Sequence, residues 1–149
     1  MLQKFEEIAL PEPLLVDDAK YESAMTRWSY IEYKYGCRVR GEFILLSGDH
    51  IGGKLIKHWS SVEQDEDGFI IASPRTCLHK DYTRLFGYPR TGKIDMNHFI
   101  GLPVVISTRC VMRNVDHRTR GRDKRYSVVD RVMNLVCLYN TPLSAEANG

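Results

Sequence analysis

The segment Phe43–Leu55, FILLSGDHIGGKL, constrains the fold more than any other part of the sequence. Its apolar run ends in a glycine-rich turn, and the next run, KLIKHWSSV at Lys54–Val62, is rich in β-branched and aromatic residues. Both runs are typical of strands, and a short turn joins such strands as an antiparallel hairpin. We therefore expect a sheet of consecutive strands, since repeated βαβ units would place a helix after each strand.

Gly48, Gly53 and Lys54 in this turn have the spacing of a phosphate-binding loop, G-x-x-x-x-G-K-[S/T]. Such a loop needs Ser or Thr after the lysine to ligate magnesium, and position 55 is Leu. It also opens a helix, whereas the residues that follow favour a strand. The sequence therefore argues against a nucleoside triphosphate site. Instead, it predicts that Gly48, Gly52 and Gly53 are turn and bulge residues with positive φ.

Strand-like segments continue on both sides of the hairpin. Ser29–Tyr35 alternates and is rich in aromatic residues, and Cys37–Leu46 leads into the turn. Alternation in the latter gives one face to Cys37, Val39 and Phe43 and the opposite face to Arg38, Arg40 and Glu42. Phe69–Ala72 and Leu102–Met112 are further strand candidates. From Tyr126 to Val136 the apolar spacing suits a strand or a helix, and periodicity does not decide between them.

Ser73–Gly87 is the best helix candidate. Ser73 is a suitable N-cap, Pro74 suits the first helical position and Gly87 follows the end. The apolar residues with helical spacing are Leu78, Tyr82 and Leu85.

The resulting order of strands, with one helix between the third and fourth long strands, is that of the OB-fold, a five-stranded, partly open Greek-key barrel. We expect an all-β, OB-fold domain at residues 26–139. Residues 1–25 are interpreted as an acidic N-terminal extension and residues 140–149 as a flexible C-terminal tail.

A chain of 149 residues with 43% hydrophobic and 27% charged residues suits one globular domain. No apolar run approaches the roughly 20 residues of a membrane span, and the N-terminus has no signal-peptide pattern, so we expect a cytoplasmic protein without a membrane partner. The cysteines show no C-x-x-C spacing and are interpreted as small buried hydrophobic residues, with no zinc site. They are Cys37, Cys77, Cys110 and Cys137.

Charge is distributed unevenly along the chain. Residues 1–26 carry a net −4 and the remainder +6, with the densest basic cluster, RTRGRDKR, at Arg118–Arg125. A basic body with an acidic arm predicts a polyanionic partner. The acidic arm is a candidate competitor for the same basic residues.

Four strings carry a family resemblance: FILLSGDHIGGKLIKHW, YTRLFG, FIGLPVVISTRCVMRN and RYSVVDRVM. Over roughly Trp28–Met133 the chain resembles small proteins of bacteriophages and integrating mobile elements that look like single-stranded DNA-binding OB-fold proteins. The resemblance implies capture of single-stranded DNA without sequence preference, in replication, recombination or mobile-element transfer, with no cofactor, no metal and no catalytic residue.

Single-strand binding needs cations that follow the backbone and exposed rings on which bases stack. We expect phosphate contacts from Arg38, Arg40, Lys54 and Lys57, and stacking on Tyr33, Tyr35 and Trp59. A basic loop between the last two long strands would add Arg113, Arg118, Arg120, Arg122, Lys124 and Arg125. Trp28 and Phe43 are assigned to the core.

Three alternatives remain open. The histidines are scattered and no paired acids lie on the predicted strands, so a metal-dependent nuclease is less well supported than a protein without enzymatic activity. A barrel that binds proteins of a replication or recombination complex is the second alternative. RNA in place of DNA is the third, because stacking and phosphate contacts do not read the sugar. Exposed barrel edges would also allow a homo-oligomer.

Overall fold

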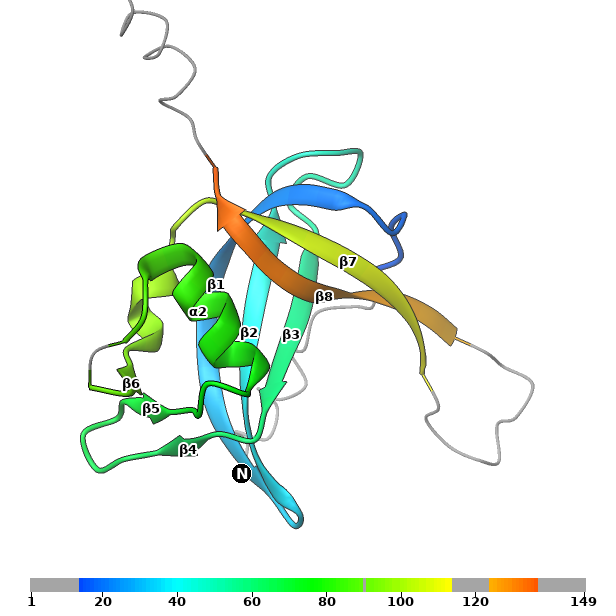
Figure 1. Cartoon of the computed structure of the whole chain (residues 1–149). Helices are drawn as coiled ribbons and strands as arrows, with labels where there is room; N and C mark the ends of the chain where they lie inside the picture. The colour runs from blue at the N-terminus through cyan, green and yellow to red at the C-terminus, as the bar shows by residue number, and fades with distance from the viewer. Residues whose placement is uncertain (1–13, 90, 114–123, 137–149) are drawn as a thin grey trace, which may run out of the picture.

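The computed structural model describes residues 14–89, 91–113 and 124–136 and consists mainly of strands (Figure 1). Five long strands form one antiparallel sheet in the order β3-β2-β1-β7-β8. They are β1 (Lys20–Tyr33), β2 (Gly36–Leu45), β3 (Lys54–Ser60), β7 (Val104–Arg113) and β8 (Lys124–Leu135). The helix α2 (Cys77–Phe86) lies between β3 and β7 in the chain. The predicted all-β class is confirmed.

A second, smaller sheet pairs three two-residue strands in the order β4-β5-β6. They are β4 (Glu63–Gln64), β5 (Ile70–Ile71) and β6 (Lys93–Ile94), and the short 3-10 helix η1 (Met96–Phe99) follows. Ile70, Ile94 and Phe99 are buried and join the core beneath the main sheet.

The β2–β3 hairpin forms as the sequence predicted, with Phe43 opposite Leu55 and Val39 opposite Trp59. Gly48 and Gly52 have positive φ, as expected for the turn. The prediction of positive φ for Gly53 is wrong. This glycine instead lies close to its neighbours: a Cβ there would be 2.5 Å from the Leu14 side chain and 3.0 Å from the His50 carbonyl.

Residues 124–135 form a strand, which resolves the ambiguity between helix and strand. β8 pairs with β7 along its length, but Asp130 and Met133 have no partner in the register. Each extra residue shifts the alternation by one position, so the buried residues change from Ser127 and Val129 to Val132. This shift produces an apolar spacing in the sequence that also suits a helix.

The ordered fold begins earlier than the predicted boundary at residue 26. β1 starts at Lys20, and Val16 is buried in the core. Residues 14–19 lie across β7 and β8: Ser127 N donates to the Leu14 carbonyl (2.7 Å) and Thr108 N to the Ala19 carbonyl (3.0 Å). We call residues 14–19 the N-terminal strap. The first thirteen residues of the predicted acidic extension lie outside the described part of the chain, as does the predicted tail at 140–149.

Helix α2 begins one turn later than predicted, with Thr76 as its N-cap in place of Ser73. The Thr76 hydroxyl accepts from His79 N at 3.2 Å, and Gly87 with φ 92° ends the helix. The prediction that the cysteines are buried is wrong for Cys77 and Cys110, which are exposed, while Cys37 is half-buried and Cys137 is outside the described residues. Within the described residues, no helix has the length and apolarity to cross a membrane.

Candidate nucleic-acid interface

The outward face of β1, β2 and β3 presents rows of side chains that the register fixes. One row contains Ser29, Arg40 and His58, and the next contains Ile31, Arg38 and Ser60. We call these six residues the basic face. Residues two apart on a strand are separated by roughly 7 Å, so Arg38 and Arg40 are close neighbours along β2.

The two arginines of the basic face have no carboxylate partner among the described residues. The guanidinium carbon of Arg38 lies 4.3 Å from the centre of the Tyr33 ring, and no ion pair of Arg40 is found in that part of the chain. Other arginines are neutralised: Arg84 contacts Asp81 at 2.8 Å and Arg109 contacts Asp130 at 3.0 Å. Positive charge is therefore left available at the basic face.

The acid on the outward side of β2, Glu42, is already compensated. Glu42 is two residues from Arg40 on the same outward side of β2, is almost fully buried and lies 3.2 Å from Arg27 Nε. Thr26 also donates to Glu42 Oε1 at 3.2 Å. Arg27 and Glu42 thus mark the neutral boundary of the basic face.

His58 reports the positive potential at this face. Partial burial of the ring lowers its pKa to about 4, with further contributions from the positive charges of Arg38, Arg40 and Lys57. His58 is therefore neutral at pH 7 and offers a flat ring and one hydrogen-bond donor beside two cations.

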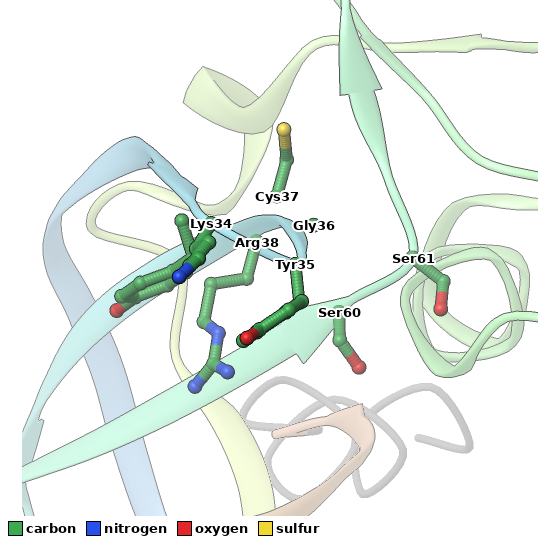
Figure 2. Close-up of a pocket in the computed structure, with 8 residues that line it drawn as sticks. Lys34, Tyr35, Gly36, Cys37, Arg38, Ser60 and Ser61 are labelled. Carbon is green, nitrogen blue, oxygen red and sulfur yellow. The ribbon is translucent and has the colours of Figure 1, made fainter.

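An open hollow of about 430 Å³ lies at the end of the basic face, where the β1–β2 turn meets the end of β3 (Figure 2). The turn supplies Tyr33, Lys34 and Tyr35, and β3 with the residue after it supplies Ser60 and Ser61. The Arg38 side chain extends past the Tyr35 ring, whereas the Cys37 thiol points to the opposite side of the strand. Rings, cations and hydroxyls therefore meet at one place.

Two predicted contacts are wrong because they lie on the inward side of β3. Trp59 is completely buried, and its indole N–H donates to Asp81 Oδ2 at 2.8 Å, so no base can stack on it. Lys57 is only 8% exposed and donates to the Asp130 carbonyl at 2.6 Å. Burial lowers the pKa of Lys57, opposed mainly by the negative charge of Asp81.

The alternation of β3 contains the signal that identifies these inward residues. Leu55, Lys57 and Trp59 alternate along β3 and therefore face the same side of the strand, and Leu55 pairs with the core residue Phe43. The residues between them face outward. His58 and Ser60 are among these, and the sequence analysis did not predict either as a site residue. Alternation could not identify Ser61 as a residue of the site, because Ser61 follows the end of β3 and has φ 62°, outside the strand conformation.

The other predicted residues fall in different places. Tyr33 and Tyr35 are exposed at the β1–β2 turn, and Lys54 is exposed at the start of β3, where it is separated from Arg40 by the row of Glu42 and Ile56. Phe43 is buried as predicted, whereas Trp28 is only partly buried and bonds Asn97 at 2.9 Å.

The predicted basic loop lies largely beyond the described residues. Arg118, Arg120 and Arg122 are not among them, and Arg113 and Lys124 are placed only as the last residue of β7 and the first of β8. Arg125 is exposed and lies opposite Met112. In Figure 1 the β1–β2 hairpin extends toward the bottom of the molecule, whereas these ends of β7 and β8 extend toward the right.

No group of three or more histidine, cysteine or acidic side chains suited to a metal ion occurs in the described segments. Comparisons with protein-family models, with curated protein sequences and with solved structures found no match. The resemblance to phage and mobile-element proteins therefore stays a prediction.

Proposed function

We propose that this protein is an OB-fold protein that binds single-stranded DNA without sequence preference through its basic face. It holds the strand by charge and stacking, without a chemical step. The observation that carries the proposal is the position of Arg38 and Arg40, two arginines without a carboxylate partner in the described residues, next to exposed tyrosine rings on an open sheet.

The topology supports the OB-fold part of the proposal. The order β3-β2-β1-β7-β8, with a helix between β3 and β7, is the strand order expected if β3 and β8 meet to close a barrel. Two contacts link these outer strands: Lys57 of β3 donates to the Asp130 carbonyl of β8, and Asp81 of α2 joins Trp59 of β3 to Arg131 of β8. The N-terminal strap lies near the start of β3, where Leu14 contacts Gly53.

The chemistry of the basic face suits an extended polyanion. A guanidinium that is not neutralised can bind phosphate through two parallel hydrogen bonds, and neighbouring arginines on one strand can follow successive phosphates. Exposed tyrosines stack on any base, which gives affinity without sequence readout. A single strand suits this surface better than a duplex, because a duplex already stacks its bases internally.

The proposal is tested by fluorescence anisotropy with a labelled oligo(dT) and an oligo(rU) of the same length. Arg38→Ala and Arg40→Ala should each weaken binding about tenfold, and each should reduce the slope of log K against log salt by about 0.7. Arg75→Ala, in the exposed turn before α2, is the matched control and should bind as the wild type does. Affinity that does not change with salt, or equal affinity of all variants, would overturn the proposal. Tighter binding of oligo(rU) would reassign the ligand to RNA.

A further inference from the structure

The hollow at the β1–β2 turn has a more specific chemistry than the rest of the basic face. We propose that it is a subsite for one unpaired nucleotide, whose base stacks on Tyr35 and whose phosphate is bound by Arg38. This inference rests on the proposed function, because the nucleotide would belong to the same bound strand.

Tyr35 is presented as a platform for stacking. Tyr33 and Gly36 are the last paired residues of β1 and β2, so Lys34 and Tyr35 form a two-residue turn between fixed strands. The Tyr35 side chain is 89% exposed, the largest exposed fraction among the large hydrophobic residues of the described chain. Covering the face of such a ring with another flat, apolar surface is favourable, because it removes apolar area from water. A nucleobase provides such a surface, and the short, paired turn limits the entropy lost on binding.

The hollow beside this ring has the size of a small ligand site. Its volume of about 430 Å³ falls within the usual range of roughly 300–1,000 Å³ for ligand pockets. It is open to solvent, with Tyr35 on one side and Ser60 and Ser61 on the other (Figure 2). An open hollow of this shape can accept one base while the rest of the strand continues along the sheet.

The polar groups around the hollow are available to a ligand. The hydroxyls of Ser60 and Ser61 make no hydrogen bond within the described residues. Ser61 has φ 62°, a left-handed conformation that is uncommon for residues other than glycine, asparagine and aspartate. Because a hydroxyl both donates and accepts, these two serines can bond the edge of any base. This agrees with binding that does not depend on sequence.

Arg38 is oriented for a phosphate next to this base. One face of its guanidinium packs on Tyr33 at 4.3 Å, which leaves the N–H groups at the edge without a protein acceptor in the described residues. An edge with several N–H donors matches two phosphate oxygens. Lys34, whose ammonium lies 5.5 Å from the centre of the Tyr35 ring, adds a second positive charge to the same turn.

The test separates the base from the phosphate. Binding of a dT octamer is compared with binding of an abasic octamer that keeps the sugars and phosphates but has no bases. Tyr35→Ala should weaken binding of the dT octamer about 5- to 150-fold, the range expected for one stacked base, and should leave the abasic octamer unchanged. Arg38→Ala should weaken binding of both. Tyr35→Phe keeps the ring and should bind like the wild type. Tyr88→Ala, another exposed tyrosine, is the control.

A dT octamer with 2-aminopurine at one position supplies a second readout. Stacking quenches its fluorescence, so the quenching seen with the wild type should be lost in Tyr35→Ala and kept in Tyr88→Ala. If the wild type binds the octamers but Tyr35→Ala binds them equally well and quenches equally, the subsite is excluded while the proposed function stands. If the wild type binds no oligonucleotide, the proposed function itself fails.

Discussion

The indole N–H of Trp59 donates a 2.8 Å hydrogen bond to Oδ2 of Asp81, and both side chains are fully buried between β3 and α2. The other carboxylate oxygen of Asp81 accepts from Arg84 NH1 at 2.8 Å, and Arg84 NH1 also donates to the Val132 carbonyl of β8 at 2.7 Å. One buried carboxylate thus connects the helix with both outer strands of the main sheet. The residue predicted to stack on a base instead holds the fold together.

Substituting Asp81 should therefore destabilise the protein strongly. Asp81→Ala leaves Arg84 without its carboxylate and the Trp59 indole without an acceptor, so we expect the free energy of unfolding to fall by about 3–5 kcal/mol. Asp81→Asn keeps an acceptor for the indole and should cost less. Urea unfolding followed by tryptophan fluorescence measures both, with exposed Asp18→Ala as the control. A loss below about 1 kcal/mol for Asp81→Ala would show that the network contributes little.

Lys57 and Lys54 provide a matched pair on β3 that tests which side of the strand meets DNA. Lys57→Met removes the donor that bonds the Asp130 carbonyl, so the free energy of unfolding should fall by about 1–3 kcal/mol. Its affinity for oligo(dT) should not change. Lys54→Met removes an exposed charge on the outward side of β3, one row beyond Glu42, so it should weaken binding and lower the salt slope, but less than Arg40→Ala does. Reduced affinity of Lys57→Met at unchanged stability would contradict the inward orientation of Lys57.

The local pattern of the sequence predicts the strands well. Contacts between distant segments determine which side chains are exposed at the candidate site and which are buried. Alternation assigned Arg38 and Arg40 to the face opposite Val39 and Phe43, and the core positions of the latter two bear this out. The same alternation applied to β3 places Trp59 inside. However, an aromatic residue near lysines also resembles a stacking site, and the hydrogen-bond acceptor that identifies Trp59 as buried, Asp81, is 22 residues away in the sequence.

Two further features depend on tertiary contacts. The bulge at Asp130 leaves this residue unpaired with β7, and its carbonyl accepts from Lys57. The strap is held by residues more than 80 positions later in the chain. A sequence window covers neither relationship. Local patterns therefore predict a start of the fold that is too late, and they do not distinguish a strand from a helix in β8.

Ser127 holds the N-terminal strap against β8. Its hydroxyl accepts from Val16 N at 2.9 Å and donates to the Val16 carbonyl at 3.1 Å, both in a buried environment. Ser127→Ala leaves these two backbone groups without partners, so we expect a loss of about 1–3 kcal/mol. Differential scanning calorimetry should show a lower Tm, whereas exposed Ser29→Ala should change it little. An unchanged Tm would mean that the strap does not contribute to stability.

His58 should make the stability of the protein depend on pH. The unfolded imidazole has a pKa near 6.5, and in the folded protein partial burial and Arg38 lower the pKa to about 4. Between pH 6.5 and 4 the unfolded chain therefore takes up a proton that the folded chain does not, and stability must fall as the pH is lowered through this window. Because the ring is partly exposed, we expect a loss of about 1 kcal/mol. Unfolding of His58→Gln should depend less on pH over this range.

The same histidine reports whether phosphates cross the basic face. Bound phosphates offset the positive charges of Arg38 and Arg40, so the pKa of His58 should rise when oligo(dT) binds. Proton uptake then makes binding tighter at pH 5 than at pH 7 by an amount that His58→Gln removes. NMR titration of the imidazole with and without oligo(dT) measures the shift, and His50 in the exposed β2–β3 turn serves as an internal control. If the pKa of His58 is the same in the complex, the strand does not run over the row that contains Arg40, and the interface would have to lie elsewhere.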